Sequence, residues 1–230
     1  MELLYNSVMN SKTYKSDNYN KLYDDIFKLY HLPENKSKLL FHGWHHIKFV
    51  HDKALEFSEE LEANSELVSC SGLLHDLNYI FSDKLEPEEA KTQIIQYMIE
   101  SGYDKKTSET VAKNIEDSHL SYRGSRDISN ESKALADADT LFKALPTTPI
   151  LFASKFITQN KYDIYKLANK VVGEQKPLLD NDKYFYTDLA KEKYLKWAKI
   201  NLSLWENVLE SLEDISIKEM LKNAYELEVL

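Results

Sequence analysis

Glycine and proline are scarce in this chain, and their scarcity limits the folds that it can adopt. Each of the two occurs only 5 times in 230 residues. Strand-rich folds, and folds that alternate strands with helices, need many tight turns that depend on these residues. A sequence with so few of them favours long helices. We therefore predict an all-α protein built as a helical bundle.

Apolar residues recur at helical spacing over most of the chain. The predicted helices cover residues 20–30, 44–60, 66–80, 87–100, 107–117, 131–144, 162–172, 186–209 and 211–227. Segment 66–80 is especially apolar, and we expect it at the centre of the bundle. Loops are predicted at 121–130 and 173–182, and the first 20 residues are predicted to be an irregular lead-in or a short helix. We predict a single domain over residues 1–230, with the last two helices packed back onto the rest.

The charge balance argues against some classes of partner. The chain has 29 basic and 38 acidic residues, a formal net charge of −9, and no basic stripe. A nucleic acid polymer is therefore disfavoured as a partner on electrostatic grounds. A small anionic substrate remains compatible with this charge, because a bound metal ion would supply local positive charge.

The cysteine content and the apolar runs indicate where the chain resides. Cys70 is the only cysteine, which excludes an intramolecular disulfide and fits a reducing compartment. The first residues lack the apolar core of a secretion signal, and no stretch reaches the roughly 18 apolar residues of a membrane span. We therefore expect a cytoplasmic protein without a membrane partner. The sequence leaves the oligomeric state open.

The histidines are placed unevenly, and one of them precedes an aspartate after an apolar run. Four of the 7 histidines fall within ten residues, whereas His75 stands alone and is followed by Asp76. An imidazole and a carboxylate next to the apolar run 70–74 carry a desolvation cost unless something compensates it. A divalent cation would do so, since nitrogen and carboxylate ligands suit a transition metal. The alternative is that His75 ends the helix and Asp76 is solvated.

Two further acids lie within an apolar helical segment. Asp137 and Asp139 are two residues apart, so they point about 200° apart on a helix and do not easily face the same side. One of the two is thus a candidate metal ligand, and the other is a surface residue or a residue that supports the ligands. The spacing alone leaves the choice open.

His46, His75-Asp76 and an aspartate in the context Ala138-Asp139-x-Leu141 together resemble the H…HD…D signature of the HD superfamily of metal-dependent phosphohydrolases. The resemblance covers about residues 41–145. A second His-Asp pair, at residues 51–52, is interpreted as unrelated to the signature, because we expect it on a charged, exposed helix face.

The resemblance implies an HD-domain-like helical bundle with one divalent metal ion, of the group Mn, Fe, Co, Ni, Zn or Mg. It implies four metal ligands: His46, His75, Asp76 and Asp139. Asp139 is preferred because residues 138–141 resemble the family's Ala-Asp-x-Leu element, and Asp137 is the reserve choice. Asp76 is also a candidate for orienting the attacking water.

A second likeness concerns the start of the helix that bears His46. The phrase Phe41-His42-Gly43-Trp44-x-His46 resembles the Tyr-His-Asn-x-x-His element of cyclic nucleotide phosphodiesterases and some bacterial relatives. In those enzymes the first histidine donates a proton to the leaving group, a role that would fall to His42 here. Gly43 departs from the pattern, since asparagine is usual at that position.

Two residues between the signature elements are candidates for contact with the substrate. By analogy with many HD relatives, His119 would lie in the pocket, where it binds the substrate or protonates the leaving group. The alternative is that His119 packs at a helix end near Tyr122. Arg123 would pair with a phosphate, and its alternative is an exposed surface position.

The leading functional hypothesis is a phosphomonoesterase or phosphodiesterase that uses metal-activated water on a small, nucleotide-like phosphate ester. A di-iron oxygenase of the HD type is a second hypothesis. It would need several histidines between Asp76 and Asp139, where only His119 occurs. A non-catalytic HD-domain sensor or scaffold is a third hypothesis, and the complete set of four ligands argues against it.

Overall fold

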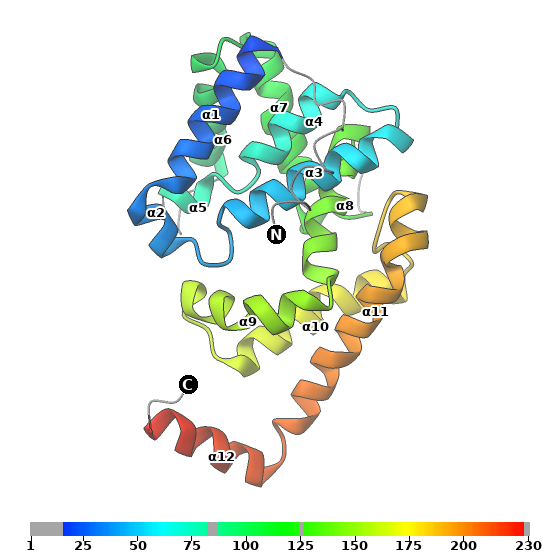
Figure 1. The fold of residues 1–230 in the computed structure, drawn as a ribbon. Coiled ribbons are helices and arrows are strands. Elements are labelled where there is room, and N and C mark those ends of the chain that lie inside the picture. The colour runs from blue at the N-terminus through cyan, green and yellow to red at the C-terminus, as the bar shows by residue number, and fades with distance from the viewer. Residues whose placement is uncertain (1–15, 82–86, 125–126, 228–230) are drawn as a thin grey trace, which may run out of the picture.

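Helices α3 (Trp44–Glu60) and α8 (Asn130–Ala144) pack against each other at the centre of the fold (Figure 1). The computed structural model describes residues 16–81, 87–124 and 127–227, and all regular structure among these residues is helical. The prediction of an all-α fold is therefore confirmed for this part of the chain. Among the same residues, no helix has the length and apolar character that crossing a membrane requires.

The remaining helices complete the described part of the chain. In chain order they are α1 (Asp17–His31), α2 (Pro33–Lys38), α4 (Ser65–Leu74), α5 (Asn78–Phe81), α6 (Pro87–Glu100), α7 (Lys105–Ser118), the short 3-10 helix η2 (Leu120–Tyr122), α9 (Thr147–Asn160), α10 (Ile164–Asp180), α11 (Asp188–Ser211) and α12 (Ile215–Glu226).

Two apolar clusters hold the bundle together, and α3 contributes to both. Ile47 of α3 packs with Leu73 and Leu74 of α4 in a cluster that also includes residues of α1, α6 and α7. Val50 of α3 packs with Leu135 of α8 in a cluster that also includes residues of α4 and α11. Helix α3 lies between the two clusters, and the apolar contacts on its two faces hold the N-terminal part of the helix in place.

A smaller apolar cluster joins α9, α10 and α11 below the bundle (Figure 1). Helix α9 is the least embedded of these three, since Thr148 is its only buried residue. The sequence did not predict α9, because the two prolines at 146 and 149 are typical of the end of the preceding helix and mask the start of a new one. Pro146 instead occupies the N-cap and Pro149 lies in the first turn, where a missing N–H costs no intrahelical hydrogen bond.

Two further expectations are corrected by the structure, and a third is tested only in part. Predicted helix 66–80 is interrupted, since α4 ends at Leu74 and α5 begins at Asn78. Residues 173–180 of the predicted loop 173–182 belong to α10, which includes Pro177. The predicted lead-in lies partly outside the described residues, and its described part from Asp17 onward is the start of α1.

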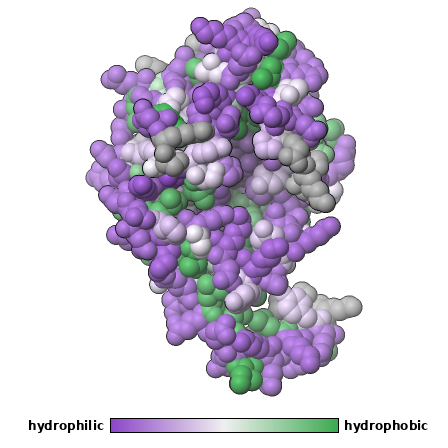
Figure 2. Space-filling view, turned by 180° about the vertical axis from the view of Figure 1, so that it is seen from behind, coloured by the Kyte–Doolittle hydropathy of each residue, from purple (hydrophilic) through white to green (hydrophobic). Residues whose placement is uncertain are grey.

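The last two helices behave differently from each other. Helix α11 packs against α3, α8 and α10, as expected of a helix folded back onto the bundle. Helix α12 buries none of its residues and lies at the lower end of the molecule, where apolar atoms remain visible at the surface (Figure 2). Ile215 and Met220 are among its exposed apolar residues. Helix α12 thus lacks the buried residues that α11 has.

Candidate metal centre

The first turn of α3 carries His46 into the interior. Gly43 caps this helix, and its carbonyl accepts a hydrogen bond from the His46 N–H at 2.9 Å. A Cβ atom at Gly43 would lie 2.6 Å from the Leu39 carbonyl oxygen, so the chain doubles back too closely for any larger residue. Steric crowding therefore explains the glycine at this position. His46, three residues later, is only 1% exposed.

The end of α4 carries His75 and Asp76 to the same place. The His75 Nδ1 lies 2.9 Å from the Gly72 carbonyl oxygen, which can only accept, so Nδ1 bears the proton. The lone pair of Nε2 is consequently free to act as a ligand. Gly72 also permits the close approach of the two helices, since a Cβ there would be 2.8 Å from the His51 Cα.

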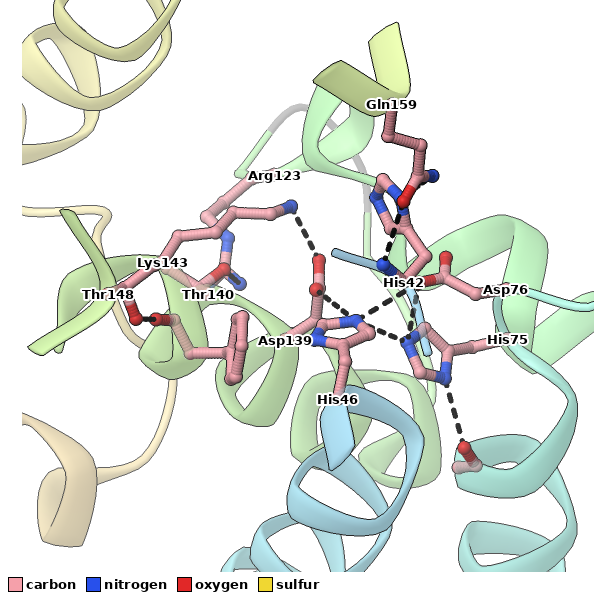
Figure 3. A network of polar contacts seen from close by, with 12 residues as sticks. His42, His46, His75, Asp76, Arg123, Asp139, Thr140, Lys143, Thr148 and Gln159 are labelled. Carbon is pink, nitrogen blue, oxygen red and sulfur yellow. Dashed lines mark hydrogen bonds and ion pairs between the residues drawn. The ribbon is translucent and has the colours of Figure 1, made fainter. Parts of the chain in front are cut away.

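Three side-chain atoms form a small triangle at this point (Figure 3). The His46 Nε2 lies 3.1 Å from the His75 Nε2 and 3.0 Å from the Asp76 Oδ2. The third side, from the His75 Nε2 to the Asp76 Oδ2, is 3.3 Å. Atoms bound to one ion at about 2.1 Å lie about 3.0–3.4 Å apart in tetrahedral or octahedral geometry. The triangle therefore has the size that a single divalent ion requires.

The state of the donor atoms also fits a metal ion. Asp76 Oδ2 is buried and has no hydrogen-bond partner among the described residues, an arrangement that costs free energy unless a further group compensates it. Burial alone would raise the pKa of Asp76, but the neighbouring His75 imidazole holds that pKa well below its usual range. The carboxylate is thus ionised, as ligation requires. Two imidazole nitrogens and one carboxylate oxygen suit a transition metal such as Mn, Fe, Co, Ni or Zn.

Asp139 stands at the edge of this triangle. Its Oδ1 lies 3.6 Å from the His46 Nε2, and its Oδ2 accepts from the Lys143 Nζ at 2.7 Å. Burial alone would lower the pKa of Lys143, but the Asp139 carboxylate raises it above its usual value. A positive charge is therefore held beside the candidate ligands.

Asp137 points elsewhere and has a different set of partners. It is fully buried and accepts hydrogen bonds from the Tyr186 and Thr187 backbone N–H groups and from the Arg123 guanidinium. The structure thus places Asp139 beside the triangle and Asp137 at the junction between α8 and the start of α11.

The structure corrects the sequence expectations for Arg123. Its side chain is 2% exposed and forms an ion pair with Asp137 at 2.9 Å. It also donates to the Tyr184 carbonyl and the Thr140 hydroxyl. Arg123 is therefore not a surface residue, and its two terminal guanidinium nitrogens are used within the protein.

The second His-Asp pair is also placed differently from the expectation. His51 is buried, with its Nε2 2.7 Å from the Tyr19 hydroxyl and its Nδ1 2.9 Å from the Asp52 Oδ1. Only Asp52 is exposed, where it pairs with Lys48. The expected exposed face is thus wrong for His51, while the pair does remain apart from the triangle.

A cavity of about 320 Å³ is lined by His42 and Lys143, which contact the candidate ligands His46 and Asp139 in turn. We call it the α9–α10 cavity, after the two helices that contribute much of its wall. The remaining wall comes from the segment before α3 and from α5, α8 and α11. Its lining includes Phe41, His42, Tyr79, His119, Lys143, Phe156, Tyr162, Lys170 and Glu174. His119 is exposed at the end of α7, and its Nδ1 lies 2.9 Å from the Ser121 hydroxyl.

His42 connects the cavity to the ligand triangle. Its ring stacks on Tyr79 with centroids 3.8 Å apart and meets the His46 ring edge-on at 5.8 Å. Burial lowers the pKa of His42 to about 4, so the imidazole is neutral at pH 7. Its Nδ1 lies 2.7 Å from the Gln159 amide nitrogen (Figure 3).

Sequence reasoning missed Lys143 and Gln159. Lys143 follows Asp139 by four residues on a predicted helix, a spacing that brings opposite charges together and signals the pair. Gln159 belongs to the unpredicted α9 and meets His42 across 117 residues of sequence. Nothing in the local sequence signals that contact.

Comparison with known proteins agrees with this geometry. Residues 43–143 match the model of the HD domain family, which confirms the predicted HD domain. The crystal structure of Bacillus subtilis YpgQ in complex with ADP is similar, with 24% identity, a TM-score of 0.55, and coverage of 86% of this chain and 97% of that chain. A second structure of YpgQ has 20% identity and a TM-score of 0.58, with coverage of 85% and 95%. These likenesses show a shared fold. No curated protein matches the sequence.

Proposed function

We propose, from the premise that residues 43–143 form an HD domain, that this chain hydrolyses a small phosphate ester with the help of one divalent metal ion. The observation that carries the proposal is the triangle of two imidazole nitrogens and one carboxylate oxygen beside the α9–α10 cavity. Four side chains would hold the ion: His46, His75, Asp76 and Asp139.

The lining of the cavity favours a nucleotide-like substrate. Lys143 and Lys170 offer positive charge to phosphate groups, and Tyr79, Phe156 and Tyr162 offer aromatic surface to a base. The structure of YpgQ with ADP supports this class, because a protein of similar fold binds a nucleoside diphosphate. The net charge of −9 disfavours a polymer, so we propose a small molecule.

The residues around the ligands would divide the remaining work. When bound, the ion supplies a Lewis acid that neutralises charge on a phosphoryl oxygen and makes water more acidic. Lys143 adds positive charge on the cavity side of Asp139. His42 lies on the cavity wall, where it would meet the leaving oxygen, and the exposed His119 would contact the substrate at the rim.

The test is turnover of a panel of nucleotides, phosphomonoesters and phosphodiesters by protein loaded with Mn, Co or Ni. We expect product release without oxygen, and its loss in His75→Ala. His45→Ala is the matched control, because His45 precedes His46 but is exposed and stacks on Phe152.

Two outcomes would contradict the proposal. Absence of turnover in metal-loaded protein across the panel would favour a sensor or scaffold. A strict requirement for iron and oxygen would instead assign the chain to the oxygenase class.

A further inference from the structure

The amide of Gln159 is oriented by two backbone groups. Its Oε1 lies 2.8 Å from the Phe41 nitrogen and 3.3 Å from the His42 nitrogen. Backbone N–H groups only donate, so the amide atom that faces them must be the oxygen. The oxygen and nitrogen of a side-chain amide are alike in size and shape, so their positions are assigned from their hydrogen-bond partners. Here the two backbone donors fix the orientation of the Gln159 amide.

This orientation decides which nitrogen of His42 carries the proton. The Gln159 NH₂ group then faces the His42 Nδ1, at 2.7 Å. Because an NH₂ group only donates, Nδ1 must accept, and the proton of the neutral ring resides on Nε2. The other neutral tautomer and the imidazolium both carry a proton on Nδ1. In either state the Nδ1–H group would face the Gln159 NH₂ group, and two donors would oppose each other.

The ring is held in place with its Nε2 available. His42 is 6% exposed, stacks on Tyr79 with an angle of 9° between the ring planes, and lines the α9–α10 cavity. Its Nδ1 is occupied by Gln159, and no described residue accepts a hydrogen bond from Nε2. The Nε2–H group is therefore free to donate to a ligand in the cavity.

We propose that Gln159 is a positioning residue that fixes His42 as the neutral Nε2–H tautomer, so that His42 meets the substrate as a hydrogen-bond donor and not as an imidazolium acid. The role toward the substrate rests on the proposed function, whereas the tautomer does not. A fixed donor of this kind stabilises negative charge that develops on the leaving oxygen, and it needs no proton from solution. The resemblance of residues 41–46 to the Tyr-His-Asn-x-x-His element implied that His42 gives a proton to the leaving group. The present assignment replaces that role.

The decisive variant is Gln159→Glu. A glutamate keeps the acceptor oxygen for the Phe41 and His42 N–H groups, so it preserves the structural contact. It removes the NH₂ donor and places a second acceptor against the His42 Nδ1, which favours a proton there. Gln175→Glu is the matched control, because it adds the same charge to the wall of the same cavity, while the Gln175 side-chain oxygen accepts from the Tyr184 hydroxyl and not from His42.

The measurement is ¹⁵N NMR of histidine-labelled, zinc-loaded protein at pH 7, with the His42 signals assigned by their absence in His42→Phe. We expect the Nε2–H pattern in wild type and in Gln175→Glu, and a protonated Nδ1 in Gln159→Glu. An Nδ1–H or doubly protonated His42 in wild type overturns the proposal, even if Gln159→Glu does not fold. An unchanged tautomer in folded Gln159→Glu overturns it as well.

Kinetics test the consequence for the reaction. Gln159→Glu should lower kcat on the order of 100-fold, as loss of one oriented donor does elsewhere, with little change in KM. A wild-type kcat in a variant with the altered tautomer overturns the role toward the substrate. If the NMR patterns are as expected but wild type hydrolyses no phosphate ester, the tautomer assignment stands and the proposed function is the part that fails.

Discussion

At the scale of single residues, two carboxylates on α8 have separate tasks. Asp139 lies half-buried beside the ligand triangle and pairs with Lys143, whereas Asp137 is fully buried and pairs with Arg123. Their separation by two helical positions points them to opposite sides. A candidate metal ligand and a structural ion pair therefore lie within one turn of the same helix.

We predict losses of stability of different size for the two amide substitutions. Asp137→Asn should lower the free energy of unfolding by about 3–5 kcal/mol, because Arg123 would remain buried without its counter-charge. The asparagine NH₂ would also face the Tyr186 and Thr187 N–H donors. Asp139→Asn should cost less than about 1 kcal/mol, since its half-exposed pair with Lys143 contributes little.

Urea unfolding in the presence of a chelator measures both changes, and elemental analysis of the folded proteins completes the comparison. Asp139→Asn should bind less metal, and folded Asp137→Asn should keep it. Equal losses of stability in the two variants, or loss of metal in folded Asp137→Asn alone, would contradict the division of tasks.

The sequence predicts single residues well where the chemistry is local. His75 and Asp76 adjoin an apolar run, and the structure brings both beside His46. The burial of Arg123 was not foreseen, because its partners Asp137 and Tyr184 are brought to it by tertiary packing. Gln159 was missed for the same reason, since its contact with His42 is created by tertiary packing alone.

At the scale of elements, the chain contains helices of unequal importance to stability. Helix α12 has a helical pattern of apolar residues, which is why the sequence predicted it, yet it buries none of them. Helix α11 buries residues along its length, including Trp205 in the cluster with Leu167 and Ala168 of α10. Periodicity predicts that a helix forms, but it does not tell whether the apolar face finds a partner within the chain.

We predict that a variant ending after Leu212 keeps the stability of the full chain within about 1 kcal/mol, because removing α12 exposes little buried apolar surface. Chemical denaturation followed by circular dichroism measures this. Trp205→Ala provides the contrast, with an expected loss of about 3–5 kcal/mol for a buried aromatic side chain. A large loss on removal of α12, comparable with that of Trp205→Ala, would show that α12 packs against the bundle.

At the scale of the whole molecule, the fold collects residues from distant parts of the sequence. The first turn of α3, the end of α4 and the middle of α8 meet because these helices pack against one another. Scarcity of glycine and proline and the helical periodicity were sufficient to predict an all-α fold. The cavity near the ligands was beyond sequence reasoning, since α9 was not predicted and the end of α10 was predicted to be a loop. The proximity of both to His42 also depends on long-range packing.

The central claim, that His46, His75 and Asp76 hold a metal ion, is tested most directly by the metal content of purified protein. Elemental analysis should find about one divalent transition-metal ion per chain in wild type and in the control His45→Ala. In folded His75→Ala the content should fall to a small fraction of that value, because one corner of the ligand triangle is lost. Equal metal content in wild type and His75→Ala would contradict the account.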